Sequence, residues 1–265
     1  MLKRKKTFYI LLFLLLILLI FLSIISVKKI KKKYFSSKCM QSVYSLESSS
    51  PFSINKIVYF SSANCNSKIN SNSSFTISDL YQYTDIAIFI NNNSDGNFTA
   101  ENTLKSVTLS DINFSLAPSI GTPNLYFKNI NDFASNRYDE NNKIENSIEF
   151  LATSEDEIDY SRPVLFNNCA NPITLCYVNS NLKSDYTLTD NISNISYDGS
   201  LLKRCSITLN SIACKISFLI TIENNLNEFY TCPVILNIPL SSENSTVYDG
   251  SLILNYSCNY GFIKL

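Results

Sequence analysis

The residues of this chain best suited to chemistry are its cysteines, and their spacing suggests one local pair. The eight are Cys39, Cys65, Cys169, Cys176, Cys205, Cys214, Cys232 and Cys258. An even number permits disulfides in an exported domain, although eight cysteines allow on the order of 100 pairings. If Leu209 and Asn210 form a two-residue turn, Cys205 and Cys214 lie opposite each other on adjacent strands. They are therefore the candidate disulfide, and the alternative is that they are free thiols in the core.

Metal and cofactor chemistry is not expected from the residue types present. The sequence has no C-x2-C pair and no histidine, whereas structural zinc sites use closely spaced cysteines and histidines. The absence of histidine also excludes Ser-His-Asp and Cys-His catalysis and the HExxH metalloprotease motif. The sequence has only five glycines and contains neither GxxxxGK[ST] nor GxGxxG. A glycine-rich loop that holds the phosphates of a nucleotide is therefore not expected. We therefore predict no catalytic, cofactor-binding or metal-binding residues.

Two kinds of catalysis remain open on residue types alone. A glycosidase needs only a pair of carboxylates, and the chain has 22 acidic residues, although no pair stands out. A Ser-Lys nucleophile would also need no histidine, and such neighbours occur at residues 37–38 and 67–68. Adjacency in sequence does not establish the geometry that catalysis requires. The expectation is therefore that the protein is not an enzyme.

A six-residue pattern occurs twice near the C-terminus. Residues 197–202 read YDGSLL, and residues 248–253 read YDGSLI. Asp-Gly favours the type I′ turns of β-hairpins, so the pattern predicts two similar β-turns. The alternative is a calcium or ligand site formed by Asp198 and Asp249. It is less favoured because calcium takes six or more oxygen ligands.

The elements that position these residues begin with a membrane anchor. Residues 8–27 form an apolar run of twenty, with basic residues on both sides, and a helix of this length is about 30 Å long and crosses a bilayer. A cleaved leader would have a shorter core and end at a small-residue site, which is missing here. We predict an uncleaved signal anchor at 8–27, preceded by a basic tail at 1–7, with the lipid bilayer as its partner.

The orientation of the anchor follows from the chain on either side of it. Four basic residues precede the apolar run and five follow it closely, so the two flanks nearly cancel under the positive-inside rule. A short basic N-terminus before a single span and a long domain favours an N-terminus inside the cell. The sequence thus predicts a single-pass protein of the cell membrane, with its C-terminal domain outside the cytoplasm.

The charge of the domain differs from that of the whole chain. Residues 1–33 hold nine of the 22 basic residues and none of the 22 acidic ones, which leaves 13 basic and 22 acidic residues and a formal charge of −9. Nucleic-acid binding needs clustered lysine and arginine. This charge therefore argues against a nucleic-acid partner.

From residue 56 onward the hydrophobic pattern has a period of two, which is typical of strands. Residues 215–223 and 234–240 alternate most clearly, 148–152 do so as well, and 85–90 form a nearly continuous apolar run suited to a central strand. A break in phase at Ser110 and Asp111 predicts a bulge or tight turn. Residues 78–83 suit a short helical turn. The expected fold is all-β, an antiparallel sandwich of the Ig-like or jelly-roll-like kind.

The domain organisation has one open alternative. Residues 28–55 read as a basic and then serine-rich tether. Two sandwich regions are expected at 56–160 and 161–265, joined in the acidic stretch at 153–159, and one continuous wide sandwich fits equally well. The favoured function is a non-catalytic surface or envelope interaction or structural module that binds an unknown protein. A glycan-binding module that uses exposed tyrosines is the alternative, followed by a carboxylate-dependent envelope hydrolase.

Overall fold

The computed structural model describes residues 50–70, 74–93, 96–157, 159, 161–183, 186–188, 195–238 and 245–265. These residues belong to one compact unit, Glu47–Leu265. The predicted tail at 1–7, the anchor at 8–27 and most of the tether at 28–55 lie outside them, as does Cys39. In the described part of the chain, no helix combines the length and the apolar character that a membrane span requires.

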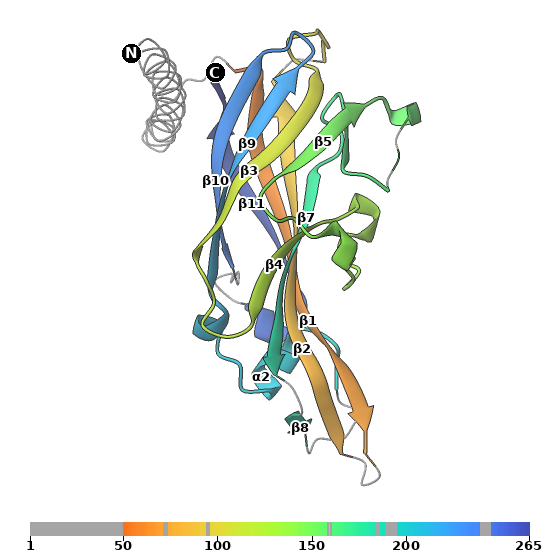
Figure 1. Cartoon of the computed structure of the whole chain (residues 1–265), viewed down its shortest axis with the longest axis vertical. Helices are drawn as coiled ribbons and strands as arrows, with labels where there is room; N and C mark the ends of the chain where they lie inside the picture. The colour runs from red at the N-terminus through yellow and green to blue at the C-terminus, as the bar shows by residue number, and fades with distance from the viewer. Residues whose placement is uncertain are drawn as a thin grey trace, which may run out of the picture. The chain divides into compact units, whose positions relative to one another are not determined.

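One sheet, sheet A, contains the two longest strands (Figure 1). Its strands run in the order β11-β1-β2-β7-β4, with β8 paired to β2, and all of its pairs are antiparallel. The strands are β1 (Phe52–Ile69), β2 (Phe75–Asn92), β4 (Thr122–Phe127), β7 (Ile173–Lys183), β8 (Tyr186–Leu188) and β11 (Leu252–Gly261).

The second sheet, sheet B, has the order β12-β10-β9-β3-β5-β6. Its pairs are antiparallel except for the parallel pair of β5 and β6. The strands are β3 (Leu104–Leu116), β5 (Ile148–Thr153), β6 (Val164–Phe166), β9 (Cys214–Asn224), β10 (Phe229–Ile238) and β12 (Ile263–Lys264). The main apolar core joins side chains of both sheets. The predicted all-β class is therefore confirmed: two largely antiparallel sheets pack on each other.

The alternation read from the sequence matches the burial of the strands. Along β9, residues from Cys214 to Asn224 are alternately buried and partly exposed, with Ile216, Phe218 and Ile220 in the core. This is the pattern of a strand with one face on the core. The phase break is confirmed as well, because the register of β3 against β9 shifts after Ser110, and Asp111 has a positive φ of 55°. Such a shift is a β-bulge.

Three local predictions are wrong. The helical turn expected at 78–83 is part of β2, where residues 79–83 pair with β1. The tether ends before residue 55, since β1 begins at Phe52 and pairs with both β2 and β11. Leu209 and Asn210 are not a hairpin turn but belong to the 3-10 helix η5 (Leu209–Ile212), with Thr208 as its N-cap.

The two repeats form helical turns instead of hairpins, and they touch each other. The first leads into α2 (Ser200–Arg204), where Asp198 accepts hydrogen bonds from the Ser200 N–H and hydroxyl. The second contains η6 (Val247–Asp249), where Asp249 completes a capping box. The Gly199 N–H donates to the Gly250 carbonyl at 3.1 Å. Asp-Gly precedes the first short helix and ends the second. The preference of Asp-Gly for hairpin turns, on which the prediction rests, does not separate hairpins from such helix ends.

Each sheet combines strands from both halves of the sequence. Sheet A joins β1, β2 and β4 to β7, β8 and β11, and sheet B joins β3 and β5 to β6, β9, β10 and β12. The acidic stretch at 153–159 contains the short helix η3 (Glu155–Glu157). A second, smaller apolar cluster lies around α2, at the end of β1 and β2 that is remote from Phe52 (Figure 1).

Candidate functional site

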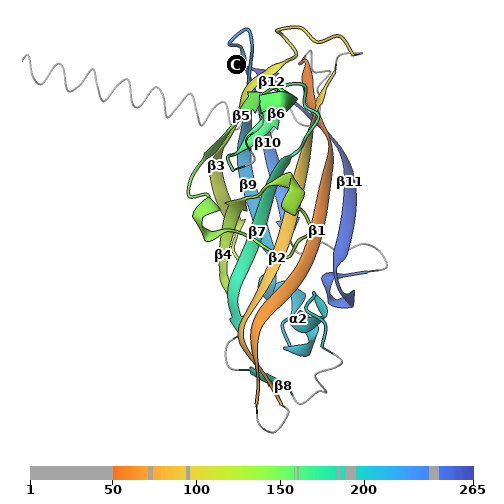
Figure 2. The ribbon, with the colours of Figure 1, turned by 90° about the vertical axis from the view of Figure 1, so that its right-hand side faces the viewer.

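The outer face of sheet A carries a covered polar site. The chain from Lys128 to Lys143 includes the short helices η1 (Ile130–Asp132) and η2 (Glu140–Asn142) and lies against β2 and β7 (Figure 2). Phe133, Ala134 and Tyr138 of this covering segment pack on an apolar cluster of sheet A. That cluster consists of Phe60, Tyr83, Tyr126, Cys176 and Val178. We call residues 128–143 the covering segment.

Strand register places a carboxylate at the centre of this covered face. Asp85 on β2 pairs with Phe60 on β1 and with Cys176 on β7. Because successive side chains of a strand point to opposite faces, Ile86 enters the main core and Asp85 points outward beneath the covering segment. Residues paired directly across strands have neighbouring side chains, so Asp85 is flanked by an aromatic ring and a thiol.

Asp85 forms a buried ion pair with Lys128. The Lys128 Nζ lies 2.9 Å from Oδ1 and 2.7 Å from Oδ2 of Asp85, and the side chains are 3% and 0% exposed. The Ala134 N–H donates to Oδ2 at 2.7 Å. A buried carboxylate without such donors would be strongly unfavourable. The pair therefore fixes the start and the middle of the covering segment to sheet A.

Burial controls the protonation of this site. It raises the pKa of Asp85, and the positive charge of Lys128 opposes that rise. Burial also holds the pKa of the Cys176 thiol well above its usual value, with the Asp85 charge acting in the same direction. A thiol must be deprotonated to be a strong nucleophile. Cys176 is thus poorly suited to nucleophilic chemistry.

A pocket of about 390 Å³ opens beside the ion pair. Its lining combines two aromatic rings, carboxylates, amides, an ammonium, a guanidinium and a hydroxyl: Phe127, Lys128, Asn129, Asp132, Arg137, Tyr138, Asp139, Asn142 and Ser161. Tyr138 is held in place by Tyr126, at 4.8 Å between ring centroids, and by Tyr81, at 5.8 Å. The Asp139 carboxylate accepts the Asn141 N–H as the cap of η2. We call this the covering-segment pocket.

The covering-segment pocket offers several ways to hold a polar ligand. Asp132 and Arg137 are exposed, and their side chains provide an acceptor and a set of donors beside the Tyr138 ring. Small-molecule sites commonly combine an apolar surface with a few converging polar groups. Among the residues that the structure describes, no group of three or more histidine, cysteine, aspartate or glutamate side chains is arranged to hold a metal ion.

The structure separates the candidate disulfide pair. Cys205 follows α2 and belongs to the smaller apolar cluster, whereas Cys214 starts β9 and belongs to the main core. Both are buried, and neither is cross-linked in this structure. The physical reason is that η5 replaces the expected two-residue turn, so residues 205 and 214 do not lie on adjacent strands. The repeat carboxylates Asp198 and Asp249 are used in capping.

Sequence reasoning missed the Asp85–Lys128 pair and the covering-segment pocket. One signal was present, because Asp85 begins the apolar run at 85–90, and a charge in a buried strand implies a buried partner. The sequence does not indicate that the partner is Lys128, 43 positions away. No protein-family model matches the chain, and no curated protein or solved structure shows significant similarity to it.

Proposed function

We propose that this protein is a single-pass membrane protein whose all-β domain lies outside the cytoplasm and acts as a non-catalytic interaction or structural module of the cell envelope. The apolar run at 8–27 and its basic flanks support attachment to the lipid bilayer. The formal charge of −9 after residue 33 suits an exposed domain that does not bind nucleic acid. An Ig-like or jelly-roll-like topology is part of the proposal.

The length of β1 and β2 carries this proposal. Each strand has 18 residues, and at about 3.3 Å per residue they extend about 60 Å. The described chain begins at Ser50, beside the start of β1, and β1 ends and β2 begins at the opposite end of the pair (Figure 1). The end at Ile69 and Phe75 is thus the part of these strands farthest from Ser50.

The remote end of β1 and β2 presents groups suited to a protein partner. Ile69 is 61% exposed and Tyr197 is 46% exposed. The Tyr197 hydroxyl is hydrogen-bonded to the Ser67 hydroxyl at 2.8 Å, which holds the ring beside β1. Aromatic and aliphatic side chains held in place in this way are common in protein interfaces.

Protease treatment of intact cells that express the full chain tests the proposed location. We expect cleavage to release a protected fragment that starts near residue 50, because the exposed tether is cut and the sandwich resists cleavage. Lysed cells give the same fragment as a control. Protection of the whole chain until lysis would place the domain in the cytosol and contradict the proposal. Turnover of a glycan, ester or peptide by the purified chain would contradict a non-catalytic role.

The covering-segment pocket favours glycan binding as a second candidate function. Tyr138 provides an apolar ring, and Asp132, Arg137 and Asn142 surround it with hydrogen-bonding groups. A sugar presents both an apolar face and hydroxyls, so this combination suits it. Three charged residues of the lining are exposed. Asp139 caps η2, whereas neither Asp132 nor Arg137 makes a side-chain hydrogen bond or ion pair with another residue that the structure describes, so these two can be substituted without removing a contact of the fold.

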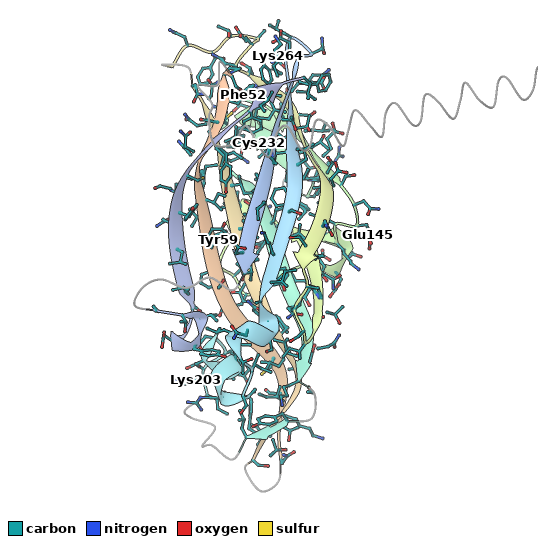
Figure 3. All side chains as sticks on the ribbon, turned by 90° about the vertical axis from the view of Figure 1, so that its left-hand side faces the viewer. Phe52, Tyr59, Glu145, Lys203, Cys232 and Lys264 are labelled. Carbon is teal, nitrogen blue, oxygen red and sulfur yellow. The ribbon has the colours of Figure 1, made fainter. Side chains whose placement is uncertain are left out.

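A glycan array probed with the full chain in detergent tests this second function. We expect Asp132→Ala and Arg137→Ala to lower the signal for a bound glycan at least about tenfold, the effect of losing a charged hydrogen bond. Lys203→Ala is the control, because Lys203 lies near the lower end of the domain (Figure 3) and does not line the pocket. Binding that is equal in all three variants would exclude the pocket as the site. Hydrolysis of the glycan would support the carboxylate-dependent hydrolase instead.

A further inference from the structure

Two buried cysteines from distant parts of the chain share the smaller apolar cluster. Cys65 lies on β1 and is 7% exposed, and Cys205 directly follows α2 and is 0% exposed. The two elements pack against each other. Of the cysteines in the described ranges, only these two belong to this cluster. The fold thus brings together residues 65 and 205, which nothing in the sequence pairs.

The two thiols share a buried environment. Burial raises the pKa of the Cys65 thiol to about 11, and the charge of Cys205 is the second cause of that rise. Burial also raises the pKa of Cys205 to about 11. Few thiolates are therefore present in the folded domain at neutral pH, and disulfide exchange proceeds through thiolates. Oxidation of this pair is expected during folding, before the cluster closes.

We propose that Cys65 and Cys205 form a disulfide when the domain folds in an oxidising compartment. The thiolate of one cysteine attacks the disulfide of an oxidant, either an oxidised thiol–disulfide oxidoreductase or oxidised glutathione, and forms a mixed disulfide. The second thiolate then attacks the protein sulfur of that mixed disulfide. The two cysteines lose two protons and two electrons, and the oxidant leaves as two thiols. The cross-link would join β1 to the residue that directly follows α2. This proposal rests on the proposed export of the domain.

Mass spectrometry of the full chain tests the pairing in cells. The chain is denatured with N-ethylmaleimide before any reduction and then digested. We expect a linked peptide containing Cys65 and Cys205, about 2 Da lighter than the two free peptides together, while Cys169 is alkylated as the internal control. Alkylation of both residues in a chain that protease treatment shows to be exported would overturn the proposal, as would a linkage of either residue to Cys39.

Refolding in vitro separates this inference from the proposed location. The purified, reduced full chain is refolded in a mixture of reduced and oxidised glutathione. Formation of the 65–205 linkage there, together with its absence from cells in which the domain is protected from protease, supports the pairing and contradicts export. Failure to form it under both conditions overturns the pairing alone.

Alanine variants provide a second measurement that does not depend on peptide recovery. In the oxidised chain, Cys65→Ala and Cys205→Ala are each expected to lower the melting temperature by at least about 5 °C. The double variant should lose little more, because one cross-link has already been removed. In the reduced chain this coupling should disappear, and Cys169→Ala should show no dependence on oxidation. Additive losses that are equal in both redox states would overturn the cross-link.

Discussion

At the scale of single residues, the Asp85–Lys128 pair ties the covering segment to sheet A. Removing two charges from water is costly, and the attraction within a buried pair often does no more than balance that cost. Breaking the pair is different, because the remaining charge stays buried without its partner. The pair therefore adds little net stability. Its main effect is to fix the position of the covering segment, which follows β4, on sheet A.

Replacing Lys128 by methionine should destabilise the protein strongly. Asp85 would keep the Ala134 N–H as a donor but lose both contacts to the lysine, so we expect a loss of about 3–5 kcal/mol in the free energy of unfolding. Urea denaturation measures it. Lys203→Met, at an exposed lysine of α2, is the control and should change stability by less than about 0.5 kcal/mol. A loss below about 1 kcal/mol at Lys128 would show that the pair is hydrated.

The loss in Lys128→Met should depend on pH. Burial already raises the pKa of Asp85 in the folded state. The contribution of this carboxyl to stability therefore falls as the pH rises from the pKa of Asp85 in the unfolded chain through its higher pKa in the folded domain. Removing the lysine raises that pKa further, because the opposing positive charge is lost. The variant should therefore lose less stability at about pH 5 than at about pH 8. An equal loss at both would mean that Asp85 does not titrate in this range.

Glu228 should have the opposite dependence on pH. Hydrogen bonds from Lys264, Asn224 and Tyr230 lower the pKa of Glu228 from 4.5 to about 2. Its contribution is complete above about pH 4.5 and is lost as pH falls toward 2. Glu228→Gln should thus be less stable than the wild type at neutral pH, and the difference should shrink across this window. Urea denaturation at several pH values measures it, with Glu145→Gln, at an exposed carboxylate, as the control. A difference that stays constant would contradict the prediction.

At the scale of elements, the contact between α2 and η6 depends on a glycine. A Cβ atom at Gly199 would lie 1.9 Å from the Val247 carbonyl oxygen and 2.4 Å from that of Gly250. Both are backbone atoms, so they cannot move aside as a flexible side chain would. Gly199 has a φ of −59°, which any residue can adopt. The close contact with η6, and not the backbone conformation, therefore explains why the first repeat needs glycine here.

Gly199→Ala should therefore destabilise the smaller cluster. Overpacking of this kind costs about 1–3 kcal/mol, and urea denaturation measures it. Gly96→Ala is the matched control: its φ is +85°, but apart from its chain neighbours no described residue has an atom within 4 Å of the added Cβ, so it should lose only about 1 kcal/mol from backbone strain. A smaller loss at Gly199 than at Gly96 would show that η6 moves freely away from α2.

The strands were predictable from the sequence and the covered site was not. Alternation fixes which side of β9 faces the core, and it depends only on neighbouring residues. The pairing of Asp85 with Lys128 depends on which strands become neighbours, and β2, β7 and β4 are brought together by non-local contacts that local patterns do not encode. The prediction of a two-residue turn where η5 lies was wrong because the Thr208 side chain caps a short helix, and this capping competes with turn formation at the same residues.

At the scale of the whole domain, buried polar side chains lie between the two apolar clusters. Ser61 and Thr84 are hydrogen-bonded to each other at 2.8 Å. Two rows further along the strands, Gln82 is paired with Asn179. All four are 0% exposed. Apolar contact, the main source of stability, is therefore weaker between the clusters than within each of them.

The reduced domain should accordingly open in two steps. We expect the amides of Ala63 and Leu201, in the smaller cluster, to exchange hydrogen at a lower free energy than that of Ile220 in the main core. Native-state hydrogen exchange at rising denaturant concentration measures the three. Convergence of all of them on the global free energy of unfolding, even without denaturant, would show that the clusters unfold together.

The continuous pairing of β1 has a mechanical consequence. From Phe52 to Ile69 it is hydrogen-bonded to β2, and over its first half it is also paired with β11. A force applied between Ser50 and Ile69 would act along the already extended backbone of β1, so the covalent bonds of that strand would carry the load and its hydrogen bonds would not be opened one by one. Along this direction the domain therefore has little slack and transmits tension from one end of β1 to the other.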